Sequence, residues 1–150
     1  MSLARHMAVM RNAPFLRVLS DDALKLLAFA SDPVNLKPRQ SLFEAGEPAE
    51  GAVLVLGGQL RLYGMANGVA PRVAGVGQLI DELALVVPTQ RSVSAVAQTT
   101  CELLLLPRSQ MLKILDEYPD AAAQLQGLLA QRTSAFMAEV ENLTTRLRKA

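Results

Sequence analysis

Cysteine and histidine are scarce in this sequence. Its 150 residues contain one cysteine, Cys101, and one histidine, His6. One cysteine excludes an internal disulfide and a multi-cysteine zinc or iron–sulfur site. One histidine provides no second imidazole for a metal cluster, and it leaves no alternative histidine for a catalytic triad. We therefore expect no metal site and no cofactor, and we expect Cys101 to be a small buried side chain.

Aromatic residues and net charge are also low, which argues against nucleic-acid binding. Tryptophan is absent, aromatic residues make up 4% of the chain, and 15 basic against 14 acidic residues leave a formal charge of +1. A base-stacking platform needs aromatic side chains, and nucleic acid is attracted by a positive field. The sequence also lacks an evident nucleophile with a base and an orienting group, so we do not expect an enzyme.

Long hydrophobic runs are missing. The longest apolar stretches, such as residues 53–56 and 103–106, are far shorter than the roughly 20 residues that a membrane-spanning helix needs. The N terminus carries no sustained apolar segment of the kind found in signal peptides. Together with the single cysteine, this predicts a cytoplasmic protein without a membrane segment.

What the sequence does contain is a hydrophobic fraction of 51%, enough for one packed domain. Helix signals come first, because Ser20 can cap a helix of about three turns that Pro33 ends. Residues 34–107 then form short apolar runs separated by turns, including the hairpin signal Asn67–Gly68. Many short strands with frequent turns indicate a sandwich or barrel.

The C-terminal third reads as helix. Ser109 can cap a short helix, and Pro119 can open a second one that continues to about Arg148. Leu125, Phe136 and Leu147 are eleven residues apart, and an eleven-residue repeat keeps one face of a nearly straight helix aligned. This apolar stripe needs a partner, which is either the rest of the domain or a second copy of the chain.

The most informative segment lies between these regions. Residues 77–85 read GQLIDELAL, and residues 88–96 read PTQRSVSAV. The segment resembles the phosphate-binding cassette of the cyclic-nucleotide-binding family, in which Phe-Gly-Glu-Leu-Ala-Leu is followed by a short loop and an arginine with small neighbours. Supporting similarity comes from three further segments, residues 42–47, 53–58 and 101–108.

The resemblance covers about residues 14–135 and implies a fold. That fold is α+β, an antiparallel double-stranded β-helix (jelly roll) flanked by a short N-terminal helix and a long C-terminal helix. It divides the chain into a lead at 1–13 that can be disordered, a β-roll with flanking helices at 14–119, and a lid or dimerisation helix at 120–150. Such a roll, about 30 Å across, cannot cover a helix of roughly 43 Å, so we favour pairing of this helix in a homodimer.

The resemblance also implies a ligand site for cyclic AMP or cyclic GMP. Arg91 corresponds to the arginine that binds the cyclic phosphate, and Ser92 adds a hydroxyl donor for the phosphate or a contact to the base edge. Glu82, an acceptor when ionised, corresponds to the residue that binds the ribose 2′-hydroxyl. A short helix of Asp81, Glu82, Leu83 and Ala84 would direct backbone N–H groups toward the phosphate. Without this context, Glu82 and Arg91 could be no more than a surface ion pair.

Two further residues are expected to cover the base. In the family the base often meets the long C-terminal helix, so the resemblance makes Thr133 and Phe136 candidates for a lid. Movement of that helix would then report whether the site is occupied.

Asp81 departs from the family, which usually has glycine at this position. A carboxylate within about 4 Å of the phosphate could cost up to about 4 kcal/mol at an effective dielectric constant near 20. That is comparable to one or two charge-assisted hydrogen bonds from Arg91, at roughly 1.5–3 kcal/mol each. Alternatively, Asp81 points outward as a helix cap and has no effect on the ligand.

Two hypotheses for the function follow. The first is a cyclic-nucleotide receptor that signals through its C-terminal helix, either alone or as the sensory half of a transcription regulator. The second is a ligand-free dimerisation module of the same fold. Binding measurements with both nucleotides distinguish them.

Overall fold

The structure is a computed structural model that describes residues 2–64 and 70–131. Three helical elements come first: α1 (Leu3–Met10), the 3₁₀ helix η1 (Pro14–Leu16) and α2 (Asp21–Ala30). Serine caps open both α-helices. The Ser2 hydroxyl accepts a hydrogen bond from the Arg5 amide at 3.0 Å, and the Ser20 hydroxyl accepts one from the Ala23 amide at 3.2 Å. The predicted cap at Ser20 is thereby confirmed.

The expectation of a lead that can be disordered is wrong for residues 3–10. Met10 is fully buried and His6 nearly so, and both face inward from α1. Arg5 also forms an ion pair with Glu102 of the roll. Burial of the apolar side of α1 against the domain stabilises it, which a short isolated helix could not achieve by propensity alone.

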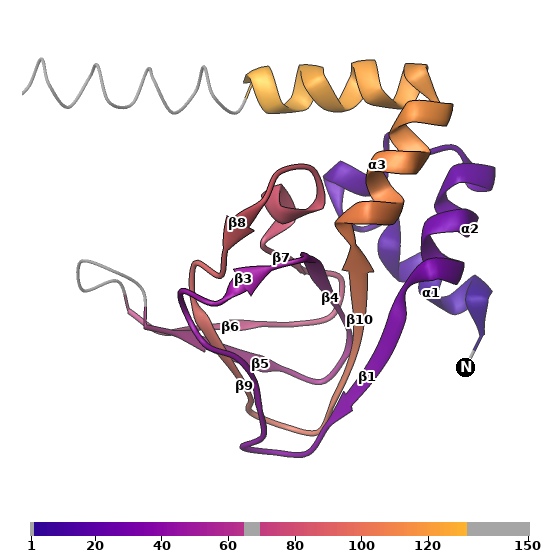
Figure 1. The fold of residues 1–150 in the computed structure, drawn as a ribbon. Coiled ribbons are helices and arrows are strands. Elements are labelled where there is room, and N and C mark those ends of the chain that lie inside the picture. The colour runs from indigo at the N-terminus through magenta and orange to yellow at the C-terminus, as the bar shows by residue number, and fades with distance from the viewer. Residues whose placement is uncertain (1, 65–69, 132–150) are drawn as a thin grey trace, which may run out of the picture.

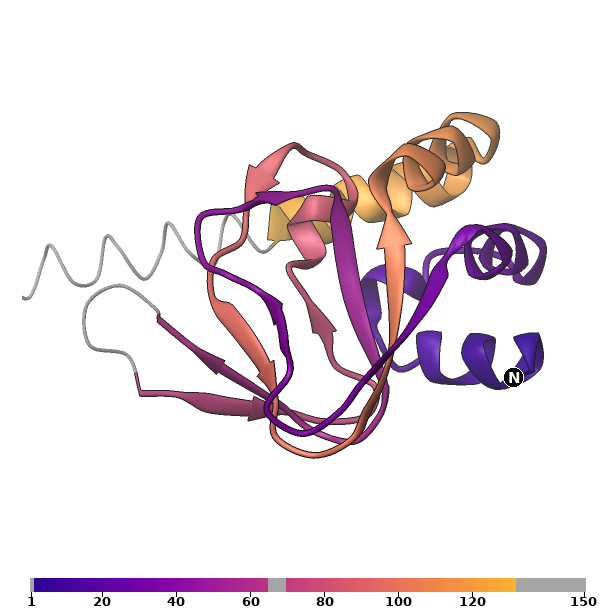
Figure 2. The same ribbon diagram turned by 60° about the horizontal axis from the view of Figure 1, so that its bottom comes forward.

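Ten strands follow in the described residues. They are β1 (Asp32–Leu36), β2 (Ser41–Phe43), β3 (Pro48–Ala49), β4 (Gly51–Gly57), β5 (Leu60–Tyr63), β6 (Arg72–Ala74), β7 (Leu79–Ile80), β8 (Thr89–Gln90), β9 (Ser94–Ala97) and β10 (Cys101–Pro107). One sheet has the order β1-β10-β4-β7, a second has β2-β9-β5-β6, and β3 pairs with β8. All the pairings are antiparallel. Figures 1 and 2 show the strands wound into a roll with the N-terminal helices on one side. The predicted α+β jelly roll is confirmed.

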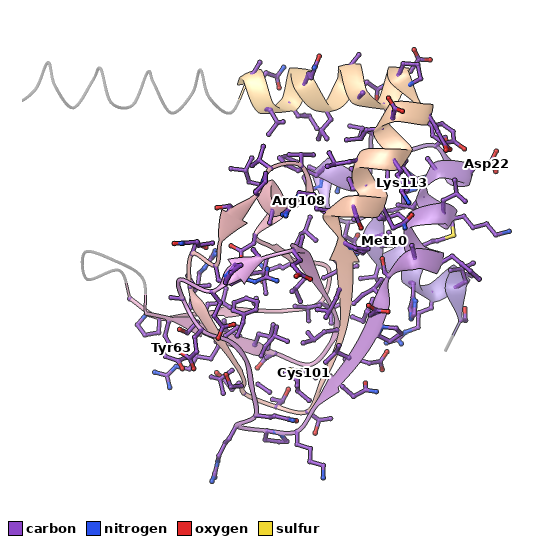
Figure 3. The ribbon with its side chains drawn as sticks, viewed as in Figure 1. Met10, Asp22, Tyr63, Cys101, Arg108 and Lys113 are labelled. Atoms are coloured by element: carbon purple, nitrogen blue, oxygen red, sulfur yellow. The ribbon has the colours of Figure 1, made fainter. Side chains whose placement is uncertain are left out.

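Two hydrophobic clusters form the core, and β4 and β10 separate them. Side chains alternate between the faces of a strand. One face packs against the helices through Ala52, Leu54, Leu56, Leu104 and Leu106. The other face fills the interior of the roll through Val53, Val55, Cys101 and Leu103. Cys101 is thus a buried side chain, as expected, and Figure 3 places it at the end of the roll far from α3.

The chain leaves the roll through α3 (Arg108–Glu117), followed by a helical segment at residues 119–131. α3 begins directly after β10 with Pro107 at the cap position, so Ser109 lies inside the helix and does not cap it. The Arg108 amide donates instead to the Glu50 carbonyl at 2.9 Å. In the next helix, Leu125 is buried in the cluster on the helical side of the roll.

Leu125, the first member of the predicted stripe, therefore packs within its own domain. Phe136 and Leu147 lie outside the described residues, as does the predicted turn at Asn67–Gly68. The pairing of two C-terminal helices and the domain boundaries at 13/14 and 119/120 stay predictions.

Candidate functional site

The cassette predicted from the sequence folds around a cavity of about 290 Å³. The cassette comprises β7, the 3₁₀ helix η3 (Glu82–Leu85), the loop to β8, and the start of β9. Five of the predicted site residues line this cavity: Asp81, Glu82, Leu83, Ala84 and Ser92. The remaining wall is formed by Arg72, Leu79, Thr89 and Gln90.

Asp81 has a backbone conformation that usually belongs to glycine. Its φ of 58° and ψ of 47° place it in the left-handed region, which costs most side-chain-bearing residues roughly 1–2 kcal/mol, although aspartate tolerates it better than most. Its carbonyl accepts a hydrogen bond from the Ala84 amide at 2.9 Å, which closes the first turn of η3.

The Asp81 side chain turns inward. Its Oδ1 accepts a hydrogen bond from the Ser92 hydroxyl at 2.8 Å, and its Oδ2 lies 3.3 Å from Nη1 of Arg91. Only 7% of the side chain is exposed. The alternative that Asp81 points to solvent as a helix cap is therefore wrong, and its side chain makes no capping hydrogen bond.

Arg91 lies behind Asp81 rather than on the wall of the cavity. The guanidinium donates from Nη1 to the Gly51 carbonyl at 2.8 Å, and its carbon lies 4.4 Å from the centroid of the Phe43 ring. The Arg91 side chain is 12% exposed. It contributes to a separate cavity of about 230 Å³ that also touches Gly51. A carbonyl, a carboxylate and an aromatic face hold it in place, so Arg91 is also a structural residue.

The wall of the 290 Å³ cavity carries both signs of charge. Its lining includes two acidic residues, Asp81 and Glu82, and one basic residue, Arg72 of β6. Sequence reasoning missed Arg72, because only the pairing of β6 with β5 brings this arginine to the cassette. The positive charge of Arg91 is balanced by the Asp81 carboxylate at 3.3 Å.

Two more residues missed by the sequence analysis hold the site in shape. The buried Ser94 hydroxyl donates to Glu44 at 3.1 Å and accepts from the Ala45 amide at 2.9 Å. Arg108 donates to the Ala49 carbonyl at 2.8 Å and to the Ala84 carbonyl at 3.1 Å, which fastens η3 to α3. Figure 3 shows Arg108 where α3 meets the roll. These partners are 24 to 59 residues away along the chain, so no local motif indicates them.

The two predicted lid residues, Thr133 and Phe136, lie outside the described residues. The helical segment at 119–131 does run across the end of the roll that carries η3 and β8, as Figures 1 and 2 both show. Within residues 2–64 and 70–131, no group of histidine, cysteine and acidic side chains could hold a metal ion. In the same ranges, no helix is long and apolar enough to span a bilayer.

A β-roll with this cassette defines a class of regulatory ligand-binding modules, and the comparison with known proteins agrees. Residues 33–118 match the cyclic nucleotide-binding domain family. The chain belongs to that family.

Particular relatives include regulators and lysophospholipases. The Cyclic AMP receptor protein of Thermus thermophilus is 30% identical over 139 residues, which are 90% of this chain and 64% of that protein. The crystal structure of the N-terminal domain of a Streptomyces coelicolor transcriptional regulator has a TM-score of 0.77 at 26% identity, covering 88% of this chain and 94% of that one. The Neurospora crassa lysophospholipase nte1 is 30% identical over 112 residues, 73% of this chain but 7% of the enzyme. The chain thus spans about two thirds, or far less, of the full-length relatives it matches.

Proposed function

We propose that this chain is a cytoplasmic regulatory domain that binds cyclic AMP or cyclic GMP in the 290 Å³ cavity of the cassette. The observation that carries the proposal is the convergence of Glu82, Ser92 and the η3 segment on one cavity in a chain of the cyclic nucleotide-binding family. The protein would act by binding rather than by catalysis.

The ribose and the phosphate of the ligand have chemically suitable partners in the cavity. The Glu82 carboxylate can accept a hydrogen bond from the ribose 2′-hydroxyl, and the Ser92 hydroxyl can donate to the phosphate. Arg91 can reach the phosphate only by sharing or giving up the carboxylate of Asp81, which it now contacts at 3.3 Å. The phosphate carries one negative charge, so the rearrangement exchanges one anion for another.

Signalling would pass through the C-terminal helix. Residues 119–131 run across the end of the roll that carries η3, and Arg108 ties η3 to α3. A ligand that binds better to one position of the helix shifts the population toward that position. Thr133 and Phe136 would cover the base, and the apolar stripe beyond Leu125 would pair with a second copy in a homodimer.

The relatives favour a sensory role. One is named a cyclic AMP receptor protein, and another is described as the N-terminal domain of a transcriptional regulator. By analogy, this chain would be a sensory half or a stand-alone receptor, with no direct contact between this domain and nucleic acid.

A second candidate is a ligand-free dimerisation module of the same fold. One observation favours it: the Asp81 carboxylate already contacts both Arg91 and Ser92. In this case the cassette would serve to stabilise the roll.

Thermal melting with each nucleotide distinguishes the two candidates. A ligand that binds only the folded state stabilises it by RT ln(1 + [L]/Kd), so cyclic AMP or cyclic GMP should raise the melting temperature. Glu82→Gln should reduce the shift, because a neutral amide accepts a weaker hydrogen bond from the ribose. Glu117→Gln on the exposed side of α3 is the matched control and should melt with an unchanged shift. No shift at millimolar nucleotide would favour the ligand-free module.

A further inference from the structure

The Asp81 carboxylate makes two polar contacts within the cassette. It accepts a hydrogen bond from Ser92 at 2.8 Å and pairs with Arg91 at 3.3 Å. These are the two side chains that, in the proposed function, would meet a phosphate. With 7% of its side chain exposed, the carboxylate is almost fully withdrawn from water.

The backbone conformation shows how the carboxylate is held there. Residue 81 is in the left-handed region, and its carbonyl closes the first turn of η3. Arg39, with a φ of 73°, is the other described residue with a side chain and a positive φ, but it is exposed in a turn. At Asp81 the conformation directs a charged group into the site rather than into solvent.

The contacts of Arg91 limit how an external anion can bind beside the Asp81 carboxylate. Arg91 is held by the Gly51 carbonyl and the Phe43 ring, so it cannot move outward without losing both contacts. An external anion must therefore displace the Asp81 carboxylate or share the guanidinium with it. Two anions close together in a poorly solvated site repel each other strongly.

We infer that Asp81 acts as a tethered counter-anion that competes with the phosphate of an incoming ligand for Arg91 and Ser92, and thereby sets the ligand concentration that the domain requires. The physiological part of this inference rests on the proposed function. The competition itself does not, because any small oxyanion can probe it. Until ligand is abundant, the Asp81 carboxylate would keep its contacts with Arg91 and Ser92.

Inorganic phosphate is the probe, and the melting temperature of the full chain is the readout. Asp81→Gly empties the position and suits the left-handed backbone, while Asp81→Asn keeps the shape and removes the charge. Arg39→Gly is the matched control, because it relieves a positive φ without touching the site. Sodium chloride at equal ionic strength corrects for general salt effects.

Phosphate should stabilise Asp81→Gly and, more weakly, Asp81→Asn. The apparent affinity of these two variants for phosphate should be at least about ten-fold above that of the wild type and of Arg39→Gly. Equal stabilisation of all four proteins would overturn the inference, and so would a phosphate response in none of them. If Asp81→Gly does not fold, Asp81→Asn against the wild type still decides between these outcomes. The Arg91 Nε–Hε resonance should move on phosphate addition in the variant that responds.

The same samples separate this inference from the proposed function. A phosphate response in Asp81→Gly without a response of any protein to cyclic AMP or cyclic GMP would support the counter-anion and refute the nucleotide site. Equal nucleotide affinity in wild type and Asp81→Gly, without a phosphate response, would support the nucleotide site and refute the counter-anion.

Discussion

Removal of the Arg91 charge should destabilise the fold, because it leaves the Asp81 carboxylate buried without its cation. The side chains of Asp81 and Arg91 are 7% and 12% exposed. Breaking a buried pair by removing one partner typically costs about 3–5 kcal/mol. Arg91→Met removes the guanidinium, so the loss combines the charge, the hydrogen bond to the Gly51 carbonyl and the cation–π contact with the Phe43 ring.

The size of the effect can be measured by a double-mutant cycle. At about 2–4 °C per kcal/mol for a chain of this length, Arg91→Met should lower the melting temperature by about 6–20 °C. Asp81→Asn should cost less, since Arg91 keeps the Gly51 carbonyl and the Phe43 ring. The double variant should recover a coupling energy of about 2 kcal/mol or more, measured by urea unfolding followed by circular dichroism.

The Arg5–Glu102 pair is the matched control for this cycle, because its side chains are 46% and 30% exposed. An exposed pair of this kind should give a coupling of about 0–1 kcal/mol. Coupling between Arg91 and Asp81 that is no larger than this control would refute the structural role assigned to the pair.

Three further predictions address the scaffold and the assembly. Gly51→Ala should be among the most destabilising substitutions, above about 4 kcal/mol by urea unfolding, since its Cβ would lie 1.8 Å from the Leu106 carbonyl oxygen; a cost below about 1 kcal/mol would show that β4 and β10 can separate. Ser94→Ala should cost about 1–3 kcal/mol, because Glu44 and the Ala45 amide lose their partner, and stability equal to the wild type would refute this role. Truncation after Arg132 should convert a dimer to a monomer in sedimentation equilibrium, whereas a full chain that is already monomeric at tens of micromolar would refute helix pairing.

The resemblance to the family's cassette named five of the residues that line the 290 Å³ cavity. Asp81, Glu82, Leu83 and Ala84 are consecutive, and Ser92 follows after one short loop, so their proximity needs little tertiary information. Turn residues that recur between short apolar runs predicted a sandwich or barrel, and the family resemblance specified the roll. The cap of α2 at Ser20 follows from the same local chemistry.

The environment of Arg91 could not be read from the sequence. Its partners Gly51 and Phe43 are 40 and 48 residues earlier in the chain, and the roll alone brings them together. The direction of Asp81 was equally undetermined, because a cap pointing outward and a carboxylate pointing inward are both ordinary roles for aspartate. α1 was missed for a related reason: its stability comes from burial of Met10 against the domain rather than from helix propensity.

Calorimetric titration of the wild type and Asp81→Gly with cyclic AMP and cyclic GMP tests the central claim most directly. At 6 Å and an effective dielectric constant of 20, two unit charges repel by about 2.8 kcal/mol, so Asp81→Gly should bind about 10- to 100-fold more tightly. Added salt should narrow this difference by screening. Binding of neither nucleotide to either protein at millimolar concentration would contradict the account.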